Sequence, residues 1–471
     1  MAEEIELKLS MQPQDLPRLD SILTHLGAAT PQTQHLQNTY FDTPALDLHK
    51  TRSALRLRNT GQQWVQTLKT SGQVQGALSQ RGEWEVQVEG PELKLELLPE
   101  KSLRPEWKNQ LKPVFTTDFT RRSWLLEKQI AGSLLRVEVA ADSGKVILPT
   151  GQQDNLCELE LELKEGQAEQ LFTLAEELAE HFCLHPAVSS KAERGLRLLQ
   201  VPRKYQAPKL EQQTSFEALN ELANHQLNEW ILCHEKWAFA ADELELQLAQ
   251  RALFRLQGIL VVQQRVCPSA PLHQARVDVK KLLKAFTPWV TASHADRVLQ
   301  SLTLEQTFAE NWRHQYLGYA QRRSDYRQLW QQKWTGQAGL KLVSSLYQSQ
   351  CMTSDFAAEK PQQLLDRAKA HLRFPRQPME ADIWIQRYPA LVRLELLLEQ
   401  VEPQRTSDRR LAMQLIQGIG DLQGYQLLLA GEEVPQEIAQ QLTSLRQELL
   451  FNLGRWAQAL WTGEPGTERR V

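Results

Sequence analysis

Three glutamates alternate with three leucines in the segment CELELELK, residues 157–164. In a β-strand, alternate side chains share a face, so Glu158, Glu160 and Glu162 would crowd one face of the strand. Like charges placed together in this way repel each other. The face therefore either lies in water or surrounds something positive. Clustered carboxylate oxygens suit a hard divalent cation.

Basic side chains follow the same alternating spacing in other segments. Near the N-terminus, Glu4, Glu6 and Lys8 share one face of EIELKL, and Arg56 and Arg58 share one face of ALRLR. Further ionic positions of this kind are Lys69, Glu83, Glu85, Glu89, Arg136, Glu138, Asp142 and Lys164. Clustered arginine and lysine suit phosphate oxygens. A metal ion together with a multiply charged phosphate chain would neutralise both sets of side chains.

Two arrangements explain these ionic faces. A half-buried antiparallel sheet commonly has one solvated face, which is sufficient for any single strand. Same-sign blocks recur from strand to strand, however, and a sheet that curls into a barrel would enclose them. The spacing alone leaves both arrangements open.

The elements that would position these side chains lie in the first 200 or so residues. Period-2 stretches are separated there by turn residues such as those at 42–44 and 59–61, which predicts an antiparallel sheet. Leucines at helical spacing predict two helices within this region, over 14–26 and 165–182.

From about residue 215 the apolar period changes to 3.6, which predicts all-α helical bundles. Breaks are expected near Pro268, Pro271, Pro288, Gly336, Gly339, Pro361, Pro375, Pro378, Pro403 and Pro435. The segment VPRKYQAPKLEQQTS (201–215) has two prolines and little apolar content, as linkers do. We therefore expect a first domain over 1–202, a linker over 203–214 and a helical domain over 215–471.

The composition is that of a globular protein, with 41% hydrophobic and 24% charged residues in a chain of 471. A net charge of −3 gives no global reason to bind nucleic acid. The five cysteines form no CxxC pair, so neither a zinc site nor a disulfide framework is predicted. The acidic N-terminus does not resemble a signal peptide, and no apolar run of about 18 residues occurs. We expect a cytoplasmic protein with no membrane partner and no specific nucleic-acid partner.

An ordered set of motifs in the first 200 or so residues resembles CYTH domains, the triphosphate tunnel metalloenzymes. Glu4-Ile5-Glu6-Leu7-Lys8 looks like the family's ExExK signature. The supporting matches are Tyr40-Phe41-Asp42-Thr43-Pro44, Leu55-Arg56-Leu57-Arg58, Lys69, Arg136-Val137-Glu138, Asp142, Glu158-Leu159-Glu160-Leu161-Glu162 and Ser190-Lys191-Ala192-Glu193-Arg194-Gly195. ExExK alone would be weak evidence, whereas the ordered set is specific.

The resemblance implies an α+β domain whose eight-stranded antiparallel β-barrel holds a linear triphosphate. It implies that Mg²⁺ or Mn²⁺ binds to carboxylates among Glu4, Glu6, Glu138, Asp142, Glu158 and Glu160. It implies that phosphate oxygens bind to Lys8, Arg56, Arg58, Lys69, Arg121, Arg136, Lys191 and Arg194. Glu4, Glu6 and Lys8 are the expected catalytic residues. In one departure from the family, Ser123 stands where related sequences often carry a second basic residue after Arg121.

The activity implied is metal-dependent hydrolysis of inorganic triphosphate to pyrophosphate and phosphate. Basic residues would position the substrate and offset its charge, which is most of what phosphoryl transfer needs. The same residues occur in class IV adenylate cyclases and thiamine triphosphatases, and a polyphosphate-binding module without turnover is a further alternative. The chain lacks GxxxxGK[ST], so a P-loop NTPase is not expected. The fused helical half favours inorganic triphosphate.

A basic helix is predicted within the second half, over LHQARVDVKKLLKAF (272–286). Its charged residues recur at helical spacing: His273, Arg276, Lys280, Lys281 and Lys284. A solvated helix face explains such a pattern. The segment also resembles the signature helix of CHAD domains, all-α domains associated with polyphosphate and often fused behind CYTH domains. The resemblance implies that these five residues bind long-chain polyphosphate, with 367–373 as a loose match to the family's second basic helix.

Overall fold

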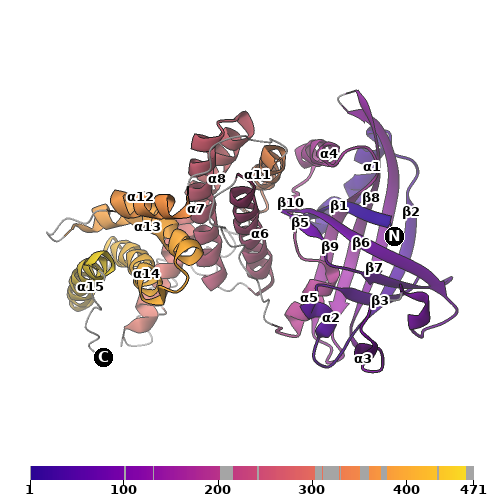
Figure 1. The fold of residues 1–471 in the computed structure, drawn as a ribbon, viewed down its shortest axis with the longest axis horizontal. Helices are drawn as coiled ribbons and strands as arrows, with labels where there is room; N and C mark the ends of the chain where they lie inside the picture. The colour runs from indigo at the N-terminus through magenta and orange to yellow at the C-terminus, as the bar shows by residue number, and fades with distance from the viewer. Residues whose placement is uncertain are drawn as a thin grey trace. The chain divides into compact units, whose positions relative to one another are not determined.

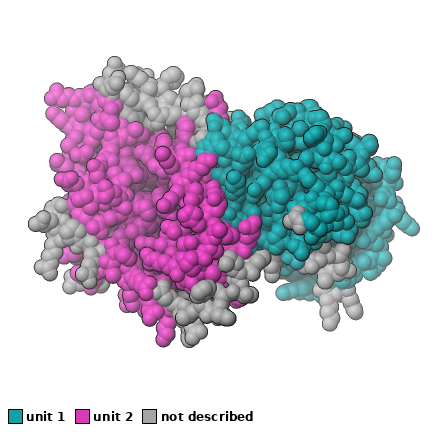
Figure 2. All heavy atoms as spheres, turned by 90° about the horizontal axis from the view of Figure 1, so that it is seen from above, with its two compact units in different colours: residues 1–206, 331–347 teal, residues 207–330, 348–471 magenta. Residues whose placement is uncertain are grey.

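The computed structural model describes residues 2–99, 102–130, 132–201, 216–240, 243–302, 310, 328, 330–350, 360–372, 379–431 and 434–462. The chain divides into two compact units, which Figure 2 colours separately. One unit contains residues 1–206 and 331–347, and the other contains residues 207–330 and 348–471. The expected linker over 203–214 lies outside the described residues.

Eight antiparallel strands of the first unit close into a barrel (Figure 1). Their bounds are β1 (Ala2–Ser10), β2 (Gln32–Asp42), β3 (Ala54–Asn59), β4 (Trp64–Lys69), β6 (Leu78–Val88), β7 (Lys112–Ile130), β8 (Ser133–Ile147) and β9 (Gln153–Glu165). They lie in the order β1-β9-β8-β7-β2-β3-β4-β6, and β1 also pairs with β6, which closes the sheet. The short strands β5 (Gln73–Gln75) and β10 (His185–Pro186) pair with β6 and β1. The predicted eight-stranded antiparallel barrel is confirmed.

Alternation along each strand sorts its side chains between the two faces of the barrel wall. Leu159 and Leu161 of β9 are completely buried on the apolar face. The helix α4 (Ala168–His181) contacts β9 and β1 and buries its own Leu174 and Leu178. Each leucine buried in this way contributes about 2 kcal/mol of hydrophobic stabilisation. The apolar face is therefore fixed by packing, and the ionic face is left for the barrel interior.

The helices predicted inside the first unit are present with shifted bounds. The prediction over 14–26 corresponds to a 3-10 helix, η1 (Pro13–Arg18), followed by α1 (Leu19–His25). Pro17 cannot donate a backbone hydrogen bond, so the regular α-helix begins only after it. The prediction over 165–182 corresponds to α4. Shorter elements are α2 (Asp47–Lys50), η2 (Leu95–Leu97) and α3 (Pro105–Lys108).

The helix α5 (Lys191–Leu198) brings its first residue to the barrel interior. It begins with a capping box, in which Glu193 N donates to Ser190 Oγ at 3.2 Å and Ser190 N donates to Glu193 Oε2 at 2.8 Å. A Cβ atom on Gly195 would lie 2.5 Å from the ring of Phe115 on β7. Glycine therefore lets α5 lie this close to the barrel wall.

One helix of the first unit comes from a distant part of the sequence. Most of α11 (Lys333–Gln350) belongs to this unit. Lys333 Nζ donates to the carbonyl oxygen of Glu180 at 3.0 Å, and Gln337 Nε2 donates to that of Ala179 at 3.2 Å. The range 215–471 thus includes one helix whose contacts are with the barrel unit.

Where the structure describes it, the second unit is all-α, as predicted. Its helices are α6 (Phe216–Ala240), α7 (Glu243–Val266), α8 (Ala270–Ser301), α12 (Pro361–His371), α13 (Ala381–Val401), α14 (Thr406–Leu429) and α15 (Gln436–Thr462). Close pairs are α6 with α7, α7 with α8 and α13, α14 with α8, α13 and α15, and α12 with α13. In the described part of the chain, no helix has the length and apolar character needed to cross a membrane.

Some predicted helix breaks are correct and others are wrong. Pro268 separates α7 from α8, and Pro403 separates α13 from α14. The break expected at Pro288 is wrong, because α8 is continuous through it. Phe286 and Val290 are buried on either side, and such packing outweighs the cost of a proline in a helix, about 3 kcal/mol. The breaks expected at Gly336 and Gly339 are also wrong, since both lie within α11. Those expected at Pro375 and Pro378 lie outside the described residues.

Candidate active site

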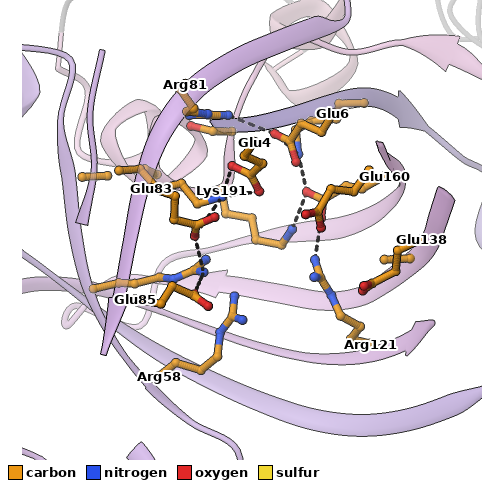
Figure 3. Close-up of a pocket in the computed structure, with 18 of the residues that line it drawn as sticks. Glu4, Glu6, Arg58, Arg81, Glu83, Glu85, Arg121, Glu138, Glu160 and Lys191 are labelled. Atoms are coloured by element: carbon orange, nitrogen blue, oxygen red, sulfur yellow. Dashed lines mark hydrogen bonds and ion pairs between the residues drawn. The ribbon is translucent and has the colours of Figure 1, made fainter. Parts of the chain in front are cut away.

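The ionic face of the barrel encloses a cavity of about 270 Å³ (Figure 3). Its cationic lining residues are Lys8, Arg56, Arg58, Lys69, Arg81, Arg121, Lys164 and Lys191. Its carboxylate lining residues are Glu4, Glu6, Glu83, Glu85, Glu138, Glu160 and Glu162. Eight cations against seven carboxylates leave this lining nearly neutral. The chemistry of each group therefore depends on which partner lies beside it.

The two glutamates of the N-terminal motif pair with cations from neighbouring strands. Lys69 Nζ on β4 donates to both carboxylate oxygens of Glu4, at 2.8 and 2.7 Å, and lies 3.3 Å from Glu83. Arg81 Nη2 on β6 donates to Glu6 Oε1 at 3.0 Å. The antiparallel register of β1 and β6, in which Glu4 is opposite Arg81, brings these groups together.

Three further carboxylates, on β8 and β9, form a buried cluster. Ligand atoms of Asp142, Glu158 and Glu160 lie within 4.8 Å of one another. Lys191 Nζ lies 2.6 Å from Asp142, 2.6 Å from Glu158 and 3.0 Å from Glu160. Lys8 Nζ donates to both Glu158 and Glu160. The first residue of α5 and the lysine of ExExK thus neutralise the cluster from two elements.

Arg121 on β7 completes this neutralisation. Its Nε and Nη2 donate to the two carboxylate oxygens of Asp142 at 2.8 and 2.7 Å, and Nη2 also donates to Glu160. Burial favours the neutral form of a carboxyl group, but Lys191 and Arg121 lower the pKa of Asp142. Glu160 behaves in the same way, because Lys191 and Lys8 outweigh its burial and lower its pKa well below its ordinary value.

Two groups of carboxylates could hold a metal ion. The ligand atoms of Asp142, Glu158 and Glu160 lie close enough together for one ion, and Lys191, Lys8 and Arg121 pair with the same carboxylates. Glu4 and Glu6 line the open cavity and offer only oxygen ligands, which hard cations such as Mg²⁺ and Mn²⁺ prefer. Mg²⁺ or Mn²⁺ therefore fits the cavity side of the ionic interior.

Arg58 differs from the other cations of the cavity. Its Nε donates to Asn38 Oδ1 at 2.9 Å, and within the described parts of the chain it forms no ion pair. Burial, together with the nearby Arg56 and Arg121, lowers the pKa of Arg58 to about 10. Arg56 itself donates to Glu85 at 3.4 Å. Arg58 is therefore a cation of the cavity whose charge is offset only in part, by the more distant Glu85.

Glu6 and Lys8 of the ExExK motif stay charged at neutral pH despite their burial. Burial alone would raise the pKa of Glu6, but Lys8 and the cations of β4 and β6 lower it to about 2. Burial would likewise lower the pKa of Lys8, but Glu158 and Glu160 raise it well above its ordinary value. Glu162 behaves differently, because its burial raises its pKa.

Ten of the predicted barrel residues line the cavity: Glu4, Glu6, Lys8, Arg56, Arg58, Lys69, Arg121, Glu138, Glu160 and Lys191. Asp142 and Glu158 are completely buried and are not part of the lining. Arg194 is also outside the lining, 3.5 Å from Asp154 and 3.8 Å from Glu158. Asp142, Glu158 and Arg194 thus contact other charged residues of the barrel and hold them in place instead of lining the cavity.

The structure does not bring Arg136 to the cavity. Its side chain is 44% exposed and pairs with Glu127 at 2.6 Å and with Glu165 at 3.7 Å. Arg136 follows the predicted alternation with Glu138, but it lies close to the start of β8, where the register with β9 shifts between Arg136 and Val137. The strand is longer than the cavity, so correct alternation is not sufficient to place this residue in the lining.

Arg81 is a lining residue that the sequence analysis missed. It shares the alternation of Glu83, Glu85 and Glu89, but Glu83 was the first position of that series to be named, whereas β6 begins at Leu78. Gly82 hides the extension, because glycine is uncommon in strand interiors. The pairing of Arg81 with Glu6 provides the signal only once the register of β1 and β6 is known.

The predicted basic helix of the second unit is α8. His273, Lys280, Lys281 and Lys284 are exposed on it, and Arg276 is half-buried. They lie along one side of the helix at its expected spacing. Of the segment 367–373, the last residue lies outside the described part of the chain.

The chain is similar to several known proteins. An inorganic triphosphatase of Haemophilus influenzae is 35% identical over 204 residues, which cover 42% of this chain and 55% of that protein. This chain thus spans about half the length of that relative.

Among solved structures, a proposed adenylyl cyclase from Hippeastrum with a dominant triphosphatase activity shows 20% identity and a TM-score of 0.31, covering 40% of this chain and 93% of that chain. The CHAD domain of the plant Ricinus communis shows 18% identity and a TM-score of 0.38, covering 56% and 93%.

The sequence model of the CYTH domain matches residues 2–196, which contain every strand of the closed barrel and every lining residue of its cavity. The barrel part of this chain is therefore similar to the CYTH domain family over its whole length.

Proposed function

We propose that this chain hydrolyses inorganic triphosphate to pyrophosphate and phosphate inside the barrel cavity, with Mg²⁺ or Mn²⁺. The observation that carries the proposal is Arg58, which lines the cavity without an ion pair in the described structure and whose pKa is lowered by burial and by the nearby Arg56 and Arg121. Phosphate oxygens bound there would restore a favourable environment for its charge. Arg56 and Arg121 are the cations that act on Arg58 most strongly, so the anion would be shared among three guanidinium groups.

The balance of charges supports a metal ion in addition to the phosphate chain. Eight lining cations face seven carboxylates, so a triphosphate would leave a large excess of negative charge. A divalent cation bound with the substrate would offset this excess. Glu4 and Glu6 would hold it, which leaves Lys69 and Arg81 for phosphate oxygens. When bound, the metal would polarise phosphate oxygens and lower the pKa of a water molecule.

The chain's own residues would then orient the phosphate chain and stabilise its charge. Guanidinium groups can take two phosphate oxygens at once, which fixes the direction of the leaving group relative to the attacking water. Lys8 and Lys191 lie deeper, where they hold Glu158 and Glu160 in place and keep Glu160 ionised. Since phosphoryl transfer depends mostly on positioning and charge stabilisation, such a lining is sufficient for catalysis.

The substrate is tested by supplying the purified full chain with tripolyphosphate, ATP and thiamine triphosphate in separate Mg²⁺ or Mn²⁺ reactions. Phosphate release and cyclic AMP are followed together. We expect tripolyphosphate to give the highest kcat/KM and no cyclic AMP to form from ATP. Preferred conversion of ATP to cyclic AMP would overturn the proposal in favour of a cyclase. Tight binding of tripolyphosphate without turnover would establish a binding module instead.

The metal assignment is tested with the double variant Glu4→Gln/Glu6→Gln. We expect it to lose activity and to need much more Mg²⁺ for whatever activity is left. The matched control is Glu127→Gln, on the same barrel but paired with the exposed Arg136 outside the cavity. Full activity in the double variant would show that the metal is held elsewhere.

For the second unit we infer that long-chain polyphosphate binds to the exposed basic side of α8. The supporting observation is that Lys280, Lys281 and Lys284 are all exposed on one helix. Replacing the three lysines by glutamine should weaken binding of long-chain polyphosphate and leave tripolyphosphate hydrolysis unchanged. Unchanged binding would show that this face is only solvated.

A further inference from the structure

The second unit contains a cavity unrelated to the barrel. It has a volume of about 490 Å³ and lies among α7, α12 and α13, which are neighbours in the fold (Figure 1). Part of its wall is apolar and includes Val261, Val262, Leu364 and Leu397. Cavities of this size with an apolar wall are typical of sites for small organic molecules.

The charged groups of this cavity all have the same sign. Arg265, Arg367, His371 and Arg393 line it, and none of the lining residues in the described chain is acidic. The barrel cavity has a different character, since nearly every cation there faces a carboxylate. A cavity with several basic groups and no acid of its own attracts an anion.

Two of these arginines lack the partners that other arginines in the same helices have. Arg251 and Arg255 of α7 pair with the buried Glu395 of α13, at 2.7 and 2.5 Å. Farther along the same two helices, Arg265 and Arg393 form no ion pair within the residues that the structure describes. Burial and the neighbouring Arg265 lower the pKa of Arg393, as expected for a cation near another cation.

A glycine places the second arginine. A Cβ atom on Gly258 would lie 3.2 to 3.3 Å from the Cβ, Cγ and Cδ atoms of Arg393. The aliphatic stem of Arg393 therefore crosses α7 where no side chain is present. Gly258, Val261, Val262 and Arg265 recur at spacings of three and four, so they share one face of this helix. Arg393 thus lies along the face that carries both the apolar wall and Arg265.

We propose that this cavity binds a small organic anion that has an apolar body, such as an alkyl phosphate or a carboxylate. Its head group would lie between Arg265 and Arg393, and its body would lie against Val262, Leu364 and Leu397. An inorganic phosphate chain would account for the arginines but would leave the apolar wall without a partner. The proposal does not depend on the function of the barrel.

The test uses calorimetric titration of the full chain with decyl phosphate, in EDTA and with saturating tripolyphosphate to fill the barrel cavity. We expect saturable binding of one decyl phosphate per chain, and no comparable binding of decanol, which lacks the charge. The double variant Arg265→Gln/Arg393→Gln should lower the affinity about tenfold or more, because it removes charge-assisted hydrogen bonds. Arg410→Gln, at an exposed position of α14, is the matched control and should leave the affinity unchanged.

A second variant keeps the charges and alters their placement. Gly258→Ala would displace the stem of Arg393 while favouring the helix, so it should weaken binding of decyl phosphate without lowering the Tm. Several results would overturn the proposal: no binding of decyl phosphate, equal binding of decanol, full affinity in the double arginine variant, or competition with tripolyphosphate. The last result would identify a site for inorganic anions instead.

Discussion

At the level of single residues, ion pairing separates two kinds of cation in the barrel. Lys8, Lys191 and Arg121 are held by buried carboxylates and keep the wall intact. Arg58 donates only to an amide oxygen in the described structure, and its pKa is lowered by burial and by neighbouring arginines. We expect the first kind to matter for folding and Arg58 to matter for the substrate.

Arg58→Gln is expected to lower kcat/KM for tripolyphosphate about 100-fold or more without lowering the Tm. It removes a charge that forms no ion pair among the described residues, so no carboxylate loses a direct partner. Arg121→Gln should lower both quantities, since the loss of one partner from a buried bidentate pair costs about 3–5 kcal/mol. Steady-state kinetics and thermal unfolding measure the two effects. An equal loss of Tm in both variants would contradict the distinction.

The free energy of unfolding is expected to fall as the pH is lowered from about 4.5 towards 2. Glu6 has a pKa of about 2 in the folded chain against 4.5 ordinarily, so over this range the unfolded chain binds the proton first. Protonation of Glu6 then favours unfolding. The stability that Glu6 contributes is fully present above about pH 4.5 and is lost as the pH falls from there to about 2. At pH 7 the wild-type protein should therefore be more stable than Glu6→Gln, and the gap should shrink by up to about 3 kcal/mol towards pH 2. Denaturant titrations at several pH values measure the gap, and a constant gap would contradict the assignment.

At the level of elements, strand alternation predicts much of the barrel and of its lining. It places Glu4, Glu6, Arg56 and Arg58 correctly. Burial of the leucines on one face of each strand determines that the other face points into the cavity. Alternation does not reveal where a strand begins or how far the cavity extends. Arg81 was missed for the first reason, and Arg136 was expected in the cavity for the second.

Sequence reasoning also could not show which charges would meet. Asp142 and Glu158 were expected to hold metal, but Lys191, from a helix beyond the last long strand, lies between them in space. Helix α5 reaches this position because Gly195 packs directly on Phe115, and that contact depends on tertiary structure. A carboxylate cluster read from sequence therefore does not distinguish a metal site from a lysine site.

Gly195→Ala tests this placement of α5. The added Cβ would meet the ring of Phe115, which stacks on Tyr40 of the cavity lining at 4.7 Å between ring centroids. We expect a loss of about 1–3 kcal/mol in stability and a fall of about tenfold in kcat/KM. Gly454→Ala in α15 is the matched control, because nothing lies within 4 Å of its Cβ.

The control variant should gain about 0.5–1 kcal/mol from helix propensity and keep full activity. Denaturant unfolding and tripolyphosphate kinetics measure both variants. If Gly195→Ala also gained stability, α5 would not be held against the barrel as the structure shows.

At the level of the whole molecule, the cavity lining lies entirely within residues 4–192, whereas α11 joins the same unit from far along the chain. Catalysis should therefore need only the barrel, and stability should also need α11. We expect a fragment of residues 1–206 to hydrolyse tripolyphosphate but to have a lower Tm than the full chain. The loss of the contacts from Lys333 and Gln337 to α4 is the physical reason. An inactive but folded fragment would contradict this division of roles.

The central claim is that the barrel cavity hydrolyses a linear triphosphate with the help of a divalent metal. ³¹P nuclear magnetic resonance of tripolyphosphate with the full chain tests it most directly, first with Mg²⁺ and then with EDTA in excess. We predict that orthophosphate and pyrophosphate appear in equal amounts with Mg²⁺ and that turnover stops when EDTA is added. Unchanged tripolyphosphate in the presence of Mg²⁺ and of Mn²⁺, or turnover that continues in EDTA, would contradict the claim.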